Sequence, residues 1–194
     1  MCPQNSDIDP IPRAIVRNLF ELAYAIYERK VLVAMEEFDD GQGVTISGLN
    51  FILICHKALF NDMLGHCMKV LDLHPRSASF WMILRMDAER VSQMASYSEN
   101  TIKFLRDIAE RIKPVRDKTH FHIDRKAVFD PKALWTEAGI TGIEYKKTLD
   151  HLWAMLTELH KVVHDREFIE RAPEYEAREV RAFLEWARSV ELVV

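Results

Sequence analysis

Residues 112–126 decide how the rest of the chain is interpreted, and they read IKPVRDKTHFHIDRK. This basic segment follows a long amphipathic helical pattern. A helical bundle needs only a short turn at that point, so the concentration of charged residues and histidines calls for another explanation. Arginine offers a forked cation that suits phosphate oxygens, and histidine exchanges a proton near neutral pH. Because RNA carries its own nucleophile in the 2′-hydroxyl, such residues can cleave a phosphodiester bond without a metal.

The composition around the basic segment predicts an all-α fold. Only six glycines and seven prolines occur in 194 residues, which favours long helices and few tight turns. A hydrophobic content of 48% is sufficient for one well-buried core. We expect residues 1–11 to be disordered and residues 12–194 to form a single helical domain.

Apolar residues at helical spacing predict four long helices, which would form a four-helix-bundle core. They span roughly residues 13–38, 49–73, 87–113 and 141–164. Short accessory helices are expected at residues 80–86 and 132–138, and a C-terminal helix from Pro173. Ser77 or Ser79 can cap the first short helix, and Thr141 with Glu144 has the spacing of a capping box. Pro114 should kink the chain just before Arg116.

The motif Lys113-Pro114-x-Arg116-Asp117-Lys118, followed by His122-x-Asp124, resembles the signature of the HEPN superfamily, nearest to its AbiU-like abortive-infection branch. The resemblance implies an all-α bundle that forms a homodimer and places the motifs of both subunits in one cleft. It also implies a metal-independent endoribonuclease that acts in host defence. Cleavage by the 2′-hydroxyl would leave a 2′,3′-cyclic phosphate.

The resemblance implies a role for each residue of the motif. Arg116 would stabilise the phosphoryl oxyanion, His122 would act as acid and base, and Asp117 would position them. The residues expected to bind RNA are Lys113, Lys118, His120, Asp124 and Lys126. No cofactor and no metal is required by this chemistry.

The choice of histidine depends on local backbone geometry. On an unbroken helix Arg116 and His120 share a face, whereas Arg116 and His122 point roughly 120° apart. His122 therefore needs a bend in the helix or a dimer axis to meet an arginine, and His120 remains the alternative. A solvated, charged helix end is the simpler interpretation of the same segment.

Charge and cysteine content limit the partners and the compartment. The chain has a formal charge of −4, but residues 103–132 alone have a net charge of +4, so RNA contact should be confined to that segment. An odd set of three cysteines without a CxxC pair favours a reducing cytoplasm. We expect no signal peptide and no membrane span. A cognate inhibitor protein is a further partner that the resemblance allows.

Two other functional classes remain open. The same basic segment could hold a nucleotide, an RNA or a protein without cutting it. Alternatively, His160 and His164 could join His56 in a three-histidine site resembling the DinB-like metal-dependent hydrolases. No glutamate lies between His160 and His164 to act as a base, which argues against the hydrolase.

Smaller groupings can be interpreted as metal or acid–base sites. His120 with His122 could ligate a metal, although the nearby cations disfavour it, and Asp117 with Asp124 could form a carboxylate pair. A further set lies on the second helix, where structural roles are favoured; it consists of Cys55, His56, His66 and Cys67.

Overall fold

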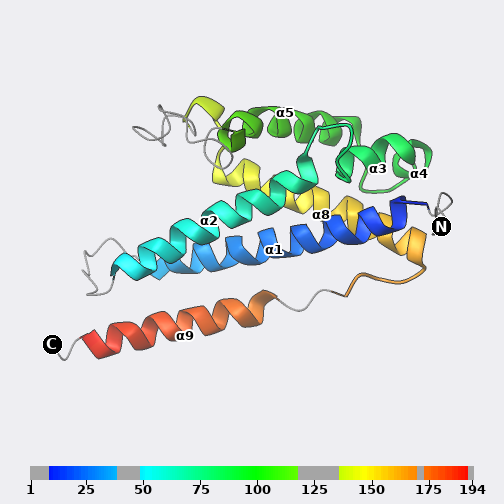
Figure 1. Cartoon of the computed structure of the whole chain (residues 1–194). Helices are drawn as coiled ribbons and strands as arrows, with labels where there is room; N and C mark the ends of the chain where they lie inside the picture. Colours follow the sequence, from blue (N-terminus) through cyan, green and yellow to red (C-terminus); the bar gives the residue numbers. More distant parts are fainter. Residues whose placement is uncertain (1–8, 39–48, 118–135, 170–172, 192–194) are drawn as a thin grey trace, which may run out of the picture. The chain divides into compact units, whose positions relative to one another are not determined.

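The computed structural model of the chain describes residues 9–38, 49–117, 136–169 and 173–191. The described residues contain helices and no strand, which confirms the predicted all-α class (Figure 1). The named helices are α1 (Ile11–Phe38), α2 (Leu49–Leu71), α3 (Phe80–Met86), α4 (Ala88–Ser92), α5 (Glu99–Arg116), α8 (Gly142–His164) and α9 (Pro173–Glu191). A HEPN-type bundle stays a prediction.

Contacts between residues divide the chain into two compact units. Unit 1 comprises Met1–Leu22 and Met68–Phe168, and therefore holds α3, α4, α5 and α8 together with the start of α1 and the end of α2. Unit 2 comprises Ala23–Cys67 and Ile169–Val194, and holds the rest of α1 and α2 together with α9. The expected division into residues 1–11 and one domain of residues 12–194 stays a prediction.

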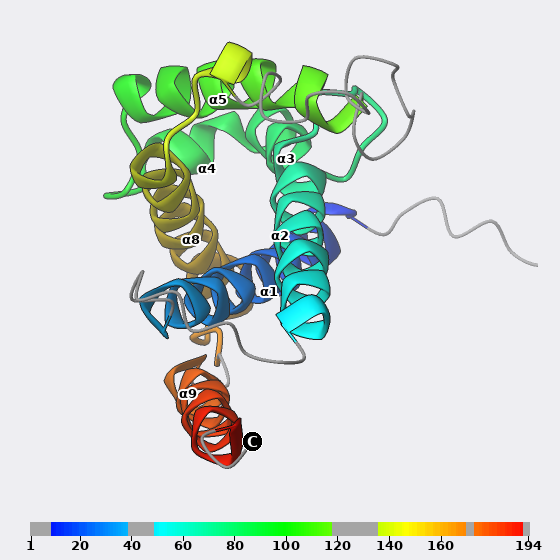
Figure 2. The ribbon, with the colours of Figure 1, turned by 90° about the vertical axis from the view of Figure 1, so that its left-hand side faces the viewer.

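The core of unit 1 lies where α5 contacts α8. Both helices repeat apolar residues at the three- and four-residue spacing that produces one buried face. Figure 2 shows α5 crossing the upper end of α8 and lying beside α3. The buried side chains of the two helices include Leu105, Ile108, Ile112 and Val115 of α5, and Leu149, Leu152, Met155 and Leu156 of α8. Full burial of each such side chain stabilises the fold by about 1.5–3 kcal/mol.

Side chains at the start of α3 donate to backbone carbonyls at the end of α2. Ser79 is the N-cap residue, as one of the two alternatives predicted, but its side chain makes no capping hydrogen bond. Its hydroxyl donates instead to the carbonyl of Asp72, at 2.7 Å. The indole Nε1 of Trp81 donates to the carbonyl of Leu71, at 2.9 Å, so a buried ring closes this corner of the core.

The third long helix was predicted wrongly as one element. α4 ends at Ser92, and α5 begins only at Glu99, after an N-cap at Ser98 whose side chain accepts from the backbone N–H of Thr101. The cause is a long-range contact. The carboxylate of Glu158 on α8 accepts hydrogen bonds from the backbone N–H groups of Ala95 and Ser96, at 2.7 and 3.0 Å, which fixes the break between the helices.

The start of α8 agrees with the prediction. Thr141 accepts from the backbone N–H of Glu144, and the Glu144 carboxylate accepts from the backbone N–H of Thr141, which is the predicted capping box. Gly139 ends the preceding helical turn at residues 136–138 with a φ of +60°, a conformation that favours glycine. α9 begins at Pro173, also as predicted.

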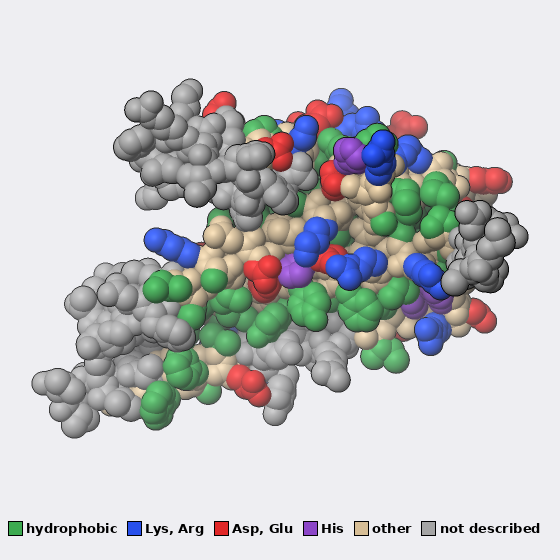
Figure 3. Space-filling model, in the orientation of Figure 1, with side chains coloured by type: hydrophobic (Ala, Val, Ile, Leu, Met, Phe, Trp, Pro, Cys, Tyr) green, Lys and Arg blue, Asp and Glu red, His purple; other side chains and the backbone are tan. Residues whose placement is uncertain are grey.

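Figure 3 shows charged side chains of both signs, with hydrophobic ones between them, over α5. In the part of the chain that the structure describes, no helix combines the length and the apolar character needed to cross a membrane.

Candidate functional site

The structure describes only part of the predicted site. Lys113 is exposed on the last full turn of α5, Arg116 is the final residue of that helix, and Asp117 is its C-cap. The other predicted site residues lie outside the described residues; they are Lys118, His120, His122, Asp124 and Lys126. The convergence of Arg116 with His122, or with His120, therefore stays a prediction.

The end of α5 lies three residues later than expected, at Arg116 instead of Lys113. Pro114 has no N–H to donate to the carbonyl of Glu110, so the helix lacks one hydrogen bond at this point. Beyond it, the backbone N–H of Asp117 donates to the carbonyls of Lys113 and Pro114. Val115 is buried and continues the apolar face of α5, which anchors the last turn. The helix thus continues through the proline and carries the first half of the motif.

Arg111 connects α5 with the chain that follows the basic segment. Its Nη1 donates to the carbonyl of Gly139, at 2.9 Å, and its Nη2 lies 2.9 Å from Oε1 of Glu144. Asp107, one turn earlier on α5, lies 2.9 Å from its Nε. These contacts raise the pKa of Arg111, chiefly through the hydrogen bond to Glu144. Residues 117 and 139, which flank the stretch containing His122, are therefore both held at the same end of α5.

A pocket of about 310 Å³ lies beside the last turns of α5 in unit 1. Its walls come from the end of α2, from the loop that follows α2, and from α5. Lys113, Asp72 and His74 supply the charged and polar groups. The other lining residues are all apolar; they are Met68, Leu71, Leu73, Pro75, Ala109 and Ile112. Pockets of about 300–1,000 Å³ suit small molecules or single nucleotides.

His74 and Asp72 were not among the predicted site residues. The Nδ1 of His74 accepts a hydrogen bond from the backbone N–H of Arg76, at 3.2 Å, so the neutral ring carries its proton on Nε2. Asp72 accepts from the backbone N–H of His74, at 3.1 Å. The sequence signal was a histidine directly before Pro75 at a helix end, but only the tertiary fold places it in one pocket with Lys113.

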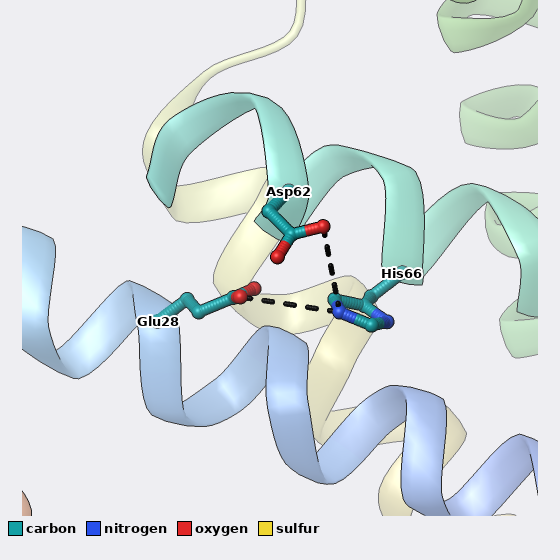
Figure 4. Close-up of side chains that lie close together, drawn as sticks. All are labelled: Glu28, Asp62 and His66. Atoms are coloured by element: carbon teal, nitrogen blue, oxygen red, sulfur yellow. Dashed lines mark ion pairs between the residues drawn. The ribbon is translucent and has the colours of Figure 1, made fainter. Parts of the chain in front are cut away.

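A separate group of metal-ligating side chains lies in unit 2, between α1 and α2. Glu28 comes from α1, and Asp62 and His66 come from successive turns of α2 (Figure 4). The Nε2 of His66 lies 3.6 Å from Oδ1 of Asp62 and 3.9 Å from Oε1 of Glu28. The candidate ligand atoms all lie within 4.8 Å of one another. We call this group the acid–histidine cluster.

The histidines of the three-histidine alternative have other contacts. The Nε2 of His56 lies 3.7 Å from Oε1 of Glu36 in unit 2. In unit 1, the buried His160 places its Nδ1 3.1 Å from the carbonyl of Arg166, and His164 places its Nε2 3.4 Å from the carbonyl of Pro12. Burial lowers the pKa of His160. Among the described residues, the acid–histidine cluster is a group of three side chains close enough to share a metal ion. His56, His160 and His164 do not form such a group.

Comparison of the chain with protein-family profiles, with curated proteins and with solved structures finds no match.

Proposed function

We propose that the chain is a metal-independent endoribonuclease of the HEPN type, with its active site at the C-terminal end of α5. The observation that carries the proposal is the pocket beside this helix end. Lys113 lines the pocket, and Arg116 follows Lys113 by three residues, just under one helical turn. Lys113, a cation that could bind a phosphate, thus lines a space of about 310 Å³ at the same helix end as Arg116.

The proposed chemistry uses the 2′-hydroxyl of RNA as nucleophile. His122 takes the proton of this hydroxyl while its oxygen attacks phosphorus. The bond from phosphorus to the 5′-oxygen breaks, and that oxygen takes a proton from an imidazolium or from water. Arg116 stabilises the negative charge on the non-bridging oxygens, and Asp117 positions the two groups. The products are a 2′,3′-cyclic phosphate and a free 5′-hydroxyl.

Lys113 and His74 are suited to bind the RNA strand around the scissile phosphate. Lys113 is exposed and can pair with a neighbouring phosphate, and the Nε2–H of His74 can donate to a base edge or a phosphate oxygen. Lys118, His120, Asp124 and Lys126 complete the proposed binding surface. The apolar wall of the pocket suits the face of an unstacked base.

The biological setting of the proposal comes from the resemblance in the basic segment. The enzyme would act as a cytoplasmic homodimer whose two motifs face one cleft, and it would function in abortive infection or as a toxin held silent by a cognate inhibitor. Dimerisation would also double the local positive charge at the end of α5, which favours RNA binding to an otherwise acidic chain.

The proposal is tested by incubating the purified chain with total RNA in excess EDTA. The wild type should cleave, whereas Arg116→Ala and His122→Ala should each lose at least about 100-fold in rate, the usual contribution of a positioned acid–base or oxyanion group. Lys146→Ala removes an exposed positive charge from α8 and serves as the matched control. Its rate should stay within about twofold of the wild type.

Two outcomes would contradict the proposal. RNA binding without cleavage by the wild type would favour the non-catalytic module. Cleavage that appears only after divalent cations are restored would favour a metal-dependent hydrolase.

A further inference from the structure

We infer that the acid–histidine cluster is a binding site for one divalent transition-metal cation, with Zn²⁺ as the reference ligand. The site is formed by Glu28, Asp62 and His66, all within unit 2. It is independent of the proposed RNA chemistry, which uses other residues and no metal.

The distances suit ligands of a common ion better than direct hydrogen bonds. Separations of 3.6 Å from His66 to Asp62 and 3.9 Å from His66 to Glu28 exceed the usual N–H···O range of about 2.7–3.2 Å. Zinc binds histidine nitrogen at about 2.0–2.1 Å and carboxylate oxygen at about 2.0–2.2 Å, so at the tetrahedral angle two of its ligands lie about 3.4 Å apart. The separation of 3.6 Å between His66 and Asp62 is close to this value, and the Glu28 oxygen at 3.9 Å reaches it with a shift of about 0.5 Å on binding.

The side chains are held in place by the helices and by a neighbouring ring. Asp62 and His66 are four residues apart on α2, so they lie on one face of the helix. The imidazole of His66 stacks on the ring of Tyr24, with centroids 5.1 Å apart, which fixes the direction of Nε2 toward the two carboxylates. Glu28 is supplied by the facing turn of α1.

Burial and charge favour a cation at this point. The Glu28 side chain is only 7% exposed, and that of His66 is 14% exposed. A bound cation would place a positive charge directly beside this buried carboxylate. Asp62 is 67% exposed, so an ion can enter from solvent on this side, and water can fill the remaining coordination positions.

The ligand set selects the class of metal. One imidazole nitrogen with two carboxylate oxygens suits Zn²⁺, Mn²⁺ or Fe²⁺ better than Ca²⁺ or Mg²⁺, which prefer oxygen ligands alone. No thiolate belongs to the cluster, so it does not favour Cu⁺. The competing explanation of the geometry is a protonated His66 that forms ion pairs with both carboxylates and binds no metal.

The direct test is calorimetric titration of the untagged, chelator-treated full chain with Zn²⁺. The wild type should bind one ion per chain, and Asp62→Asn and His66→Gln should each weaken binding at least about tenfold. Zn²⁺ at about 100 times its dissociation constant should raise the Tm of the wild type by about 5–10 °C. Circular dichroism checks that the variants are folded, and the exposed position of Asp62 makes Asp62→Asn the safer of the two.

The matched control is His56→Gln. His56 lies on the same helix, and its Nε2 is at a similar distance, 3.7 Å, from Oε1 of Glu36, but among the described residues no third ligand joins this pair. This variant should bind Zn²⁺ as the wild type does. Absence of uptake by the folded wild type would overturn the proposal, and so would equal affinity in Asp62→Asn and the wild type. RNA cleavage in EDTA is measured separately, so a failure of the metal site is distinguishable from a failure of the nuclease.

Discussion

Arg111 and Glu144 join the last turns of α5 to the first turn of α8, with Nη2 of the guanidinium 2.9 Å from Oε1 of the carboxylate. The same carboxylate accepts from the backbone N–H of Thr141 in the capping box. One side chain therefore closes the start of α8 and also holds it against α5. This contact positions the chain on both sides of the basic segment, so its strength affects both the stability of unit 1 and the proposed site.

The stability of unit 1 should depend on pH through Glu144. The backbone hydrogen bond from Thr141, followed by the hydrogen bond from Arg111, lowers the pKa of Glu144 from 4.5 to about 2. A lowered pKa means that the unfolded chain binds the proton first, so this stabilisation is complete above about pH 5 and is lost as the pH falls toward 2. Glu144→Gln should therefore lower the free energy of unfolding at pH 7 and flatten its dependence on pH between 5 and 2, as measured by urea denaturation.

The expected loss at pH 7 is about 1–2 kcal/mol, because both side chains are about one-third exposed and solvent screens the pair. Glu110→Gln makes the same chemical change at an exposed position on α5 and should alter stability by less than about 0.5 kcal/mol. Equal losses in the two variants would refute a special role for Glu144.

His160 should make the protein less stable in mild acid. Burial is the main cause that lowers its pKa below 6.5, and His151 is shifted in the same direction by burial. Because the unfolded chain takes up these protons first, the free energy of unfolding should fall as the pH drops below about 6.5. His160→Gln should show a smaller decrease between pH 7 and 5 in denaturant titrations. A decrease as steep as that of the wild type would show that another group is responsible.

Leu152 tests the core between α5 and α8. The side chain is 0% exposed, so Leu152→Ala removes buried contacts and leaves a cavity, at an expected cost of about 2–5 kcal/mol. Ile143 is 81% exposed on the first turn of the same helix, and Ile143→Ala should change stability by less than about 0.5 kcal/mol. Thermal unfolding of the two variants measures the difference, and similar Tm values would contradict the described packing of α8.

Lys113 tests whether the pocket contacts RNA. Lys113→Ala should lower kcat/KM for RNA cleavage several-fold. It should also reduce the slope of log binding constant against log salt concentration by about 1, the amount expected for one lost phosphate contact. Lys103→Ala removes an exposed charge three turns earlier on α5 and is the control. Cleavage rates at several salt concentrations provide the comparison. If both variants respond alike, the effect is one of general charge, and the pocket has no part in RNA binding.

Local sequence signals predicted the helix ends that local residues determine. The capping box needs only Thr141 and Glu144, which are three residues apart. The helix end at Gly139 needs only the positive φ that glycine adopts easily, so both helix ends could be inferred without the fold. The break between α4 and α5 is only partly local: Ser98 caps α5, but the turn before it is held by Glu158, which lies 62 residues from Ser96. A continuous helical pattern was therefore predicted where a tertiary hydrogen bond interrupts it.

The candidate sites divide in the same way. Asp62 and His66 show metal-ligand spacing on one helix, but Glu28 joins them only through the packing of α1 against α2. The sequence pattern groups His66 with Cys55, His56 and Cys67, its neighbours on the same helix, and gives no sign of Glu28. For the basic segment, the structure places Lys113 beside a pocket, while the role of His122 stays a prediction.

The most direct test of the central claim uses a short defined RNA that the wild type cleaves at one position, analysed by mass spectrometry in the presence of EDTA. The account predicts a 2′,3′-cyclic phosphate on the upstream fragment, no cleavage when that position carries a 2′-deoxy sugar, and no cleavage by His122→Ala. Cleavage of the 2′-deoxy substrate, or an undiminished rate in His122→Ala, would contradict it.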